Sequence, residues 1–309
     1  MNPLAGDEPA VSVVIPVATA GPFTRECLQS VLHSLAEFDG SGQIILVLNG
    51  LGQSGRESLA PLLAHPNVKT VERPEQIGSA PARCLGIGMA RGRHILLTDA
   101  DCLVPLDWVA EMAKAGARHG VASGQVQAAN RVLNAYVRVQ QEIDRVRNSA
   151  VTRRGIRRYP TVANMAARRE LLTYLVDDPD NTAEDVQLSL EFASRGIKVG
   201  SIDHVVVKTV YPSSFMECLS RQAKHARGVA FAQRQWRRRQ WRRLGTAGPL
   251  AFAVATFIIV WRLRLSPRER VIALALLLCF AAQWAFYLVI PRRRKQIGRA
   301  ASEARRHQQ

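Results

Sequence analysis

The sequence has few cysteines, and no two of them form a C-x-x-C pair. Five cysteines are scattered along 309 residues, so neither a disulfide framework nor a zinc site is expected. No internal repeat is visible, which argues against a solenoid or propeller. The first ten residues also lack a basic stretch followed by an apolar one, so no secretory signal is predicted and the globular part is expected in the cytosol.

Acidic residues are almost absent from the last third of the chain. Residues 218–309 carry 20 of the 42 Lys and Arg but two of the 25 Asp and Glu, so the net charge of +17 belongs to this segment. Two apolar runs interrupt the basic residues, at 248–261 and 271–290, and the second is as long as the roughly 20 apolar residues that cross a bilayer. We predict a basic juxtamembrane segment at 231–247, two transmembrane or re-entrant helices within 248–290, and a basic tail at 291–309.

The basic residues flank the apolar runs, which bears on the partner of this segment. Such an arrangement predicts contact with anionic membrane lipids and favours a cytoplasmic position for both ends of the pair of helices. A tail that binds nucleic acid has no need of apolar runs of membrane length. Nucleic acid is therefore not an expected partner.

Strand and helix signals alternate along residues 11–230, after a short N-terminal tail at 1–10. Apolar, β-branched runs at 11–17, 43–48 and 94–98 are typical of parallel strands buried on both faces. Amphipathic segments between them, the first beginning at Pro22, predict covering helices. We therefore expect an α/β domain with a mostly parallel sheet flanked by helices, whose ligands bind beyond the carboxyl ends of the strands.

Two aspartates, Asp99 and Asp101, follow the apolar strand at 94–98 directly. Carboxylates two residues apart in a turn repel each other unless a cation lies between them, and Mg²⁺ or Mn²⁺ accepts such oxygen ligands. A second pair, Asp178 and Asp180, follows no strand and is typical of a solvated loop. The position of the first pair at the ligand-binding edge leaves two interpretations open: a metal or substrate site, and a turn or cap.

A second acidic pair, Glu184 and Asp185, begins a predicted helix. Thr182 and Asp185 have the spacing of a capping box, which would explain the pair structurally. Alternatively, one of the two carboxylates faces the cleft as a general base for an acceptor hydroxyl. Both interpretations hold together, because only one residue of the pair is needed for the cap.

Basic residues recur at helical spacing in 221–228, RQAKHARG, and an arginine stands at position 83. Arginines suit diphosphate recognition, but a helix that faces solvent or lipid headgroups explains the first group equally well. For Arg83 the alternatives are a phosphate contact and an ordinary surface arginine.

Taken in order, these segments resemble the family-2 inverting glycosyltransferases of GT-A fold over roughly residues 10–230. The segments are VSVVIPV, IILVLNG, IGSAPARCLGIGMARGRHILLTDADCLVPLDW, ANMAARREL and AEDVQLSLEFASRGIKV. The resemblance implies that Asp99 and Asp101 bind the metal, Mg²⁺ or Mn²⁺, and the diphosphate of a nucleotide-sugar. It also implies a base in the Glu184–Asp185 pair, Asp185 being favoured. It further assigns Pro16, Val17 and Asn49 to the nucleoside, Gly78 and Arg83 to the donor, Asn164 and Met165 to the acceptor side, and Gln222, His225 and Arg227 to the diphosphate.

The activity implied by this resemblance is transfer of a sugar from a nucleoside diphosphate sugar to a hydroxyl of a lipid-linked or cell-envelope glycan acceptor. The Q-x-x-R-W motif of processive members reads QAKHA at 222–226, so addition of a single sugar is expected. Two other classes stay open. A nucleotidyltransferase would need a basic triphosphate-binding loop after the first strand, where no Lys or Arg precedes Arg25, and a non-catalytic membrane-tethered protein would bind nucleotides or anionic lipids.

Overall fold

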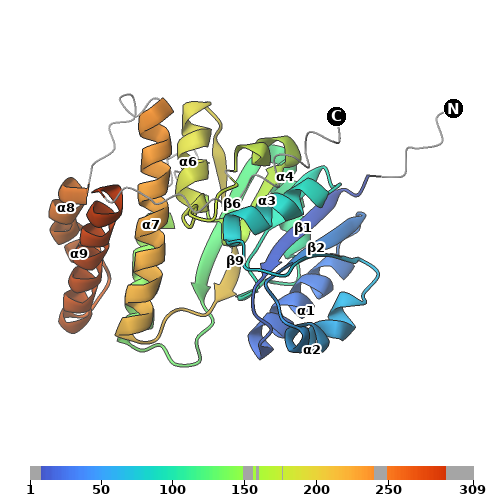
Figure 1. Ribbon diagram of the computed structural model, residues 1–309, viewed down its shortest axis with the longest axis horizontal. Coiled ribbons are helices and arrows are strands. Elements are labelled where there is room, and N and C mark those ends of the chain that lie inside the picture. Colours follow the sequence, from blue (N-terminus) through green and yellow to red (C-terminus); the bar gives the residue numbers. More distant parts are fainter. Residues whose placement is uncertain (1–7, 149–155, 158–159, 176, 240–248, 290–309) are drawn as a thin grey trace.

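The structure is a computed structural model that describes residues 8–148, 156–157, 160–175, 177–239 and 249–289 (Figure 1). A nine-stranded sheet in the order β3-β2-β1-β4-β8-β6-β9-β5, with β7 paired to β9, forms its centre. The strands are β1 (Val11–Val17), β2 (Gly42–Asn49), β3 (Val68–Arg73), β4 (His94–Leu97), β5 (Cys102–Leu103), β6 (Val121–Ala128), β7 (Ile156–Arg157), β8 (Met165–Arg168) and β9 (Val199–Thr209).

Helices lie on both faces of this sheet and beside it. They are α1 (Pro22–Ala36), α2 (Gln53–Leu63), α3 (Ser79–Met89), α4 (Trp108–His119), α5 (Ala135–Asn148), α6 (Glu184–Ser194), α7 (Phe215–Arg239), α8 (Pro249–Arg262) and α9 (Pro267–Val289). Two short 3₁₀ helices, Val162–Asn164 and Arg169–Tyr174, flank β8. The predicted α/β architecture is confirmed.

The sheet is mixed, which corrects the expectation that it is mostly parallel. Strands β3, β2, β1 and β4 are parallel, but β8 enters between β4 and β6 and is antiparallel to both. Strand β9 is parallel to β6 and antiparallel to β5 and β7. The apolar pattern reports that a strand is buried, and it carries no information about the direction of the neighbouring strand.

Alternate residues of the parallel strands pack into two cores on opposite faces of the sheet. On β1, Val13 and Ile15 face α1 and α4, whereas Val14 faces α3 and α6. Trp108 is the largest completely buried side chain of the first core, and Phe192 anchors α6 in the second. Burial on both faces explains why these strands are continuously apolar.

The capping box expected at Thr182 and Asp185 is absent at the start of α6, and α4 also starts without a side-chain cap. The side chain of Asp107 makes no capping hydrogen bond to α4, and α6 starts after Ala183 with no side-chain cap, because the Thr182 hydroxyl donates instead to the carbonyl of Lys224. At the start of α7, in contrast, the amide of Glu217 donates to Ser214 Oγ at 3.3 Å, as in a capping box.

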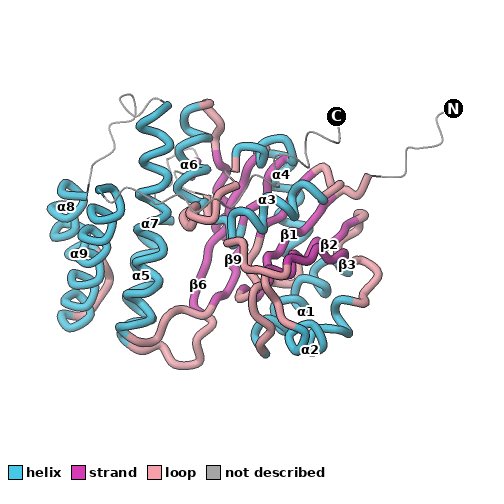
Figure 2. Tube along the Cα trace, viewed as in Figure 1, coloured by secondary structure: helices cyan, strands magenta, loops and turns pink. Residues whose placement is uncertain are grey.

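Helices α5, α7, α8 and α9 stack together at the end of the molecule opposite α1 and α2 (Figure 2). Helix α8 has 14 residues and rises about 21 Å, which is less than the roughly 30 Å hydrocarbon core of a bilayer. Among the described residues, α9 is the helix that is long and apolar enough to cross a membrane. The described part of the first predicted helix is therefore shorter than a membrane span, and the choice between a transmembrane and a re-entrant helix stays a prediction.

The predicted segment boundaries in the C-terminal part of the chain can be compared with the structure only where its residues are described. The predicted juncture between 230 and 231 falls inside α7, which continues without a break to Arg239. All of the basic tail predicted at 291–309 lies outside the described residues.

Candidate active site

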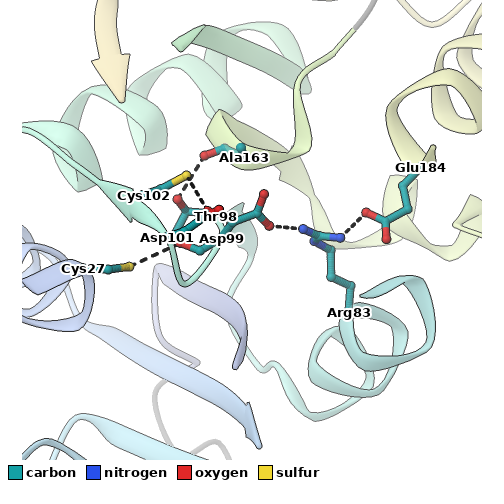
Figure 3. Close-up of polar contacts among 8 residues, drawn as sticks. All are labelled: Cys27, Arg83, Thr98, Asp99, Asp101, Cys102, Ala163 and Glu184. Atoms are coloured by element: carbon teal, nitrogen blue, oxygen red, sulfur yellow. Dashed lines mark hydrogen bonds and ion pairs between the residues drawn. The ribbon is translucent and has the colours of Figure 1, made fainter. Parts of the chain in front are cut away.

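The turn after β4 holds both aspartates of the D-x-D motif. Thr98 Oγ1 donates to the carbonyl of Ala163 at 3.0 Å, which fixes the end of the strand. The carbonyl of Asp99 then accepts from the backbone amide of Cys102 at 3.1 Å and from the thiol of Cys27 at 3.2 Å. With its carbonyl used in this way, the turn brings the carboxylates of Asp99 and Asp101 together at the carboxyl end of β4 (Figure 3).

Arg83 connects this motif to the second acidic pair. Its guanidinium donates through Nη2 to Asp99 Oδ1 and through Nη1 to Glu184 Oε2, and it lies between the two carboxylates (Figure 3). The side chains of Arg83 and Glu184 are each 4% exposed, whereas Asp99 is 34% exposed. A residue of α3 therefore joins the end of β4 to the start of α6.

Burial and charge act in opposite directions on this bridge. Burial by itself lowers the pKa of Arg83, but the charges of Glu184 and Asp99 outweigh it and raise that pKa above its ordinary value. Burial also raises the pKa of Glu184, although the guanidinium opposes the shift. Arginine stays protonated at every accessible pH, so a permanent cation stands between the two acids.

The acidic end of the site has the composition of a divalent-cation site. Ligand atoms of Asp99, Asp101 and Cys102 lie within 4.8 Å of one another. Burial raises the pKa of the Cys102 thiol well above its ordinary value, which disfavours the thiolate form that binds metals. The remaining donors are carboxylate oxygens, which suit a hard ion such as Mg²⁺ or Mn²⁺.

Asp101 differs from Asp99 in its surroundings. Asp101 is exposed on one side, but the protein surrounds the rest of its side chain. This desolvation raises the pKa of the Asp101 carboxyl, and the charge of Asp99 adds to the shift. The hydrogen bond from Cys102 and the charge of Arg221 oppose it. A cation placed between the two carboxylates would offset the repulsion that Asp99 exerts on Asp101.

Asn49 and Gly78, both predicted to lie near the donor, position α3. Asn49 at the end of β2 accepts from the amide of Ile77 at 2.8 Å and donates to the carbonyl of Gly78 at 3.2 Å. Gly78 has a φ of +95°, and a Cβ there would lie 3.2 Å from Pro179 Cα. Asn49 thus fixes the residue that precedes the helix carrying Arg83.

The start of α6 is held from the other side by α7. Gly228 of α7 lies so close that an added Cβ would meet the backbone nitrogen of Ala183 at 2.3 Å. Glu184 then turns inward to Arg83, while Asp185 is half-buried and accepts from the amide of Val186 at 2.9 Å. The two acids therefore have different environments, one enclosed and one in reach of solvent.

The predicted acceptor-side residues are enclosed. Asn164 is completely buried, accepts from Trp108 Nε1 at 2.9 Å and donates to the carbonyls of Gln125 and Val205. Met165 is also completely buried. Their side chains hold the sheet together, and any acceptor contact in this turn would come through its backbone.

Of the residues assigned to the nucleoside at the end of β1, Val17 is completely buried and Pro16 is half-buried in the register opposite Val47. Both end the strand next to β4, at the same edge of the sheet as the D-x-D turn. Strand β1 thus brings Pro16 to the predicted edge.

The basic residues of α7 face in different directions. Arg227 lies over the ring of Tyr287 and His225 packs against Phe280, both on α9, while Gln222 is buried. Arg221 was not among the predicted site residues, yet its charge lowers the pKa of Asp101.

Arg221 also approaches Asp144 at 3.6 Å, and its guanidinium lies 5.0 Å from the centre of the Tyr211 ring. Its side chain keeps 43% of its area exposed. The helical spacing predicted a basic site residue in 221–228 but did not identify this one, because one residue along a helix rotates a side chain by about 100°.

Residues 12–194, more than half of the chain, match the family profile of glycosyl transferase family 2. The chain belongs to this family. The match ends at the last residue of α6, nine residues past the Glu184–Asp185 pair, so both acidic motifs of this family member lie inside it.

Individual relatives match this family member over shorter stretches. Glycosyltransferase GlyG of Streptococcus pneumoniae serotype 4 is 28% identical over 95 residues, which is 30% of this chain and 31% of GlyG. Glycosyltransferase AglE of Haloferax volcanii is 30% identical over 103 residues, which is 33% of each protein. The matched stretch thus spans about a third of the length of these curated relatives.

A solved structure extends the likeness of the fold. The mannosyltransferase PcManGT of Pyrobaculum calidifontis, in complex with GDP-Man and Mn²⁺, is similar with a TM-score of 0.58 at 20% identity. The similarity covers 97% of this chain and 80% of that protein. The GT-A fold expected from the sequence is confirmed.

Proposed function

We propose that the chain transfers a sugar from a nucleoside diphosphate sugar to the hydroxyl of a glycan or lipid-linked acceptor, with inversion at the anomeric carbon. One observation carries the proposal: Arg83 ties the D-x-D turn to the start of α6, so the two acidic pairs of a family member meet in one site. Membership of glycosyl transferase family 2 supports the reaction class.

Asp101 and Asp99 are the proposed holders of Mg²⁺ or Mn²⁺, a choice supported by their converging oxygens and the protonated Cys102. The bound cation would neutralise charge on the leaving nucleoside diphosphate. A relative of the same fold has been solved with GDP-Man and Mn²⁺, which supports this class of donor and metal.

Asp185 is the proposed base, which takes the proton from the acceptor hydroxyl as that oxygen attacks the anomeric carbon. Its neighbour Glu184 is engaged by Arg83 and enclosed, whereas Asp185 keeps access to solvent. In this proposal, Arg83 orients Asp99 and keeps Glu184 away from the acceptor. Arg221, whose charge acts on Asp101, would add positive charge near the diphosphate.

The proposal includes association with anionic lipids on the cytoplasmic side of a membrane. The apolar helix α9 and the excess of Lys and Arg in residues 218–309 support it. Such a position would concentrate a lipid-linked acceptor near the site.

The donor is tested with a panel of nucleoside diphosphate sugars in the presence and absence of Mn²⁺. We expect release of nucleoside diphosphate only with metal. We also expect Asp101→Ala and Asp185→Asn each to lower kcat by at least about 100-fold, the usual contribution of a positioned acid–base group or metal contact.

Asp107→Asn is the matched control, since Asp107 is exposed and makes no capping bond to α4. It should leave turnover unchanged. Wild-type turnover in Asp101→Ala or Asp185→Asn would refute the assignment of the site. Binding of nucleoside diphosphates without any transfer would instead favour a non-catalytic module.

A further inference from the structure

The outward side of α9 is apolar from Val271 to the end of the helix. Exposed or half-exposed residues recur every three or four positions, which places them on one face of the helix. They are Val271, Ala275, Leu278, Ala282, Phe286 and Val289. A helix covering a water-soluble domain normally presents polar residues on this face, so the pattern indicates a partner other than water.

Helix α8 packs against α9 and also has exposed apolar side chains. Among the side chains of α8 that the structure describes, these lie within about a third of the helix circumference; they are Leu250, Phe257, Ile258 and Trp261. Figure 1 shows α8 at the edge of the molecule, beyond α9. We call the exposed apolar residues of both helices the hairpin face.

The connector between the two helices is basic and exposed. Arg262, Arg264 and Arg268 are exposed around it. Apolar side chains next to arginines match the boundary between acyl chains and anionic headgroups, whereas a protein partner gives no reason for this charge.

The same connector is bound to the catalytic domain. The backbone amide of Arg264 donates to Glu142 of α5 at 2.7 Å, and Arg138 of α5 forms an ion pair with Glu269 at the start of α9. Leu263 is buried in a cluster with side chains of α5 and α7. The turn of the hairpin is therefore part of the folded body.

The far end of α9 is bound as well. Trp284 Nε1 donates to Gln233 of α7 at 2.8 Å, and Arg234 donates to the carbonyl of Tyr287 at 2.7 Å. Helix α9 thus lies along α7 from its beginning to its last turns. It does not extend away from the domain, as an independent membrane anchor would.

We propose that the α8–α9 hairpin does not cross the membrane and instead lies flat in one leaflet, with the hairpin face toward the acyl chains of anionic lipids. Two crossing helices would place the connector on the opposite side of the membrane from α5, which the contacts of Arg264 and Glu269 with α5 exclude. The length of α8 leads to the same conclusion. The inference rests on the membrane association in the proposed function and is independent of the transfer chemistry.

Its first test compares two cysteines in proteoliposomes of phosphatidylcholine and phosphatidylglycerol. Arg268→Cys marks the connector and Ala117→Cys, exposed on α4, marks the catalytic domain, both in a background with Cys84 and Cys279 replaced by serine. A membrane-impermeant maleimide should label both positions from the same side. If Arg268→Cys reacts only after detergent is added while Ala117→Cys reacts at once, the hairpin crosses and the inference is wrong.

The second test measures binding to the same vesicles by flotation. Phe257→Glu and Phe286→Glu should each reduce partition at least about tenfold, since burying such a side chain contributes roughly 1.5–3 kcal/mol. Leu106→Glu, exposed far from the hairpin, is the matched control. An equal loss of vesicle binding in the control would overturn the inference. So would a dimer in light scattering that the two substitutions disrupt while flotation stays unchanged, because a second copy would then cover the hairpin face.

The two hypotheses fail separately. Binding of nucleoside diphosphate with Mn²⁺, measured by thermal shift, should be unchanged in Phe257→Glu and Phe286→Glu. If Asp101→Ala is inactive and the connector is labelled only after detergent is added, the flat hairpin is refuted and the site assignment stands. If Asp101→Ala is active and both cysteines are labelled from the same side, the site assignment is refuted and the flat hairpin stands.

Discussion

Replacing Arg83 by methionine tests whether the buried bridge holds the site together. The substitution keeps an unbranched side chain of similar length and removes the cation between Asp99 and Glu184. Glu184 is then left as a carboxylate that is 4% exposed and has lost its guanidinium partner. Removing one partner of a buried ion pair costs about 3–5 kcal/mol.

That loss converts to a change in melting temperature through the entropy of unfolding. At roughly 2.1 cal/mol/K per residue, a chain of this size has an unfolding entropy of about 0.65 kcal/mol/K. A loss of about 3–5 kcal/mol then lowers Tm by about 5–8 °C. Part of the cost is relieved at Asp99, which is 34% exposed and rehydrates, so the lower end of the range is the firmer expectation.

The loss should depend on pH. Burial raises the pKa of Glu184 and Arg83 lowers it, so the variant has a Glu184 pKa further above the unfolded value. A carboxyl with a raised pKa binds more protons in the folded state, so its contribution is favourable at low pH and is lost as pH rises toward the folded pKa. The destabilisation by Arg83→Met is therefore smaller near about pH 5 than near about pH 8.

The assay is thermal denaturation of wild type and variant across this pH range. Arg56→Met is the matched control, because Arg56 pairs with Glu72 at the surface, where both side chains are about half exposed. A surface pair of this kind contributes about 0–1 kcal/mol. Equal shifts for the two variants, or a shift for Arg83→Met that ignores pH, would refute the role of the bridge.

Two further substitutions probe the packing around the site. Gly228→Ala places a Cβ 2.3 Å from the nitrogen of Ala183, so it should displace the start of α6, cost about 1–3 kcal/mol of stability and reduce kcat. Gly88→Ala, with open space around it, should instead stabilise the chain by about 0.5–1 kcal/mol. Thermal denaturation and turnover assays check both variants. Trp108→Phe leaves the buried Asn164 Oδ1 without its indole donor and should cost about 1–3 kcal/mol in denaturant titrations; an unchanged midpoint would contradict the bond.

The sequence predicted the strand ends well, because burial and the carboxyl end of a strand are local properties. β1, β2 and β4 occupy the predicted ranges, and Asp99 follows β4 as expected. The sequence did not predict the partner of Arg83, which lies 101 residues away in Glu184. A helix with buried alanines around an arginine carries no mark that distinguishes an enclosed ion pair from a surface charge.

The sequence pattern also did not predict the direction of β8 or which face of α7 turns toward the site. β8 is four residues long and is antiparallel to both neighbours, and nothing in MAAR encodes that direction. On α7, the sequence favoured His225 and Arg227, but these pack on α9, and Arg221 is the residue whose charge reaches Asp101. Which face of a helix meets the sheet depends on tertiary packing rather than on periodicity.

Helix α7 has a consequence for which acceptors the site can reach. It touches the start of α6 through Gly228 on one side and α9 through Gln233 on the other, so it acts as a rigid spacer between the two acids and the hairpin face. Packed helices are about 8–10 Å apart, so the axes of α6 and α9, with α7 between them, are at most about 16–20 Å apart. If the hairpin docks on a membrane as proposed, a lipid-linked acceptor would have to bring its hydroxyl across this separation to reach the two acids.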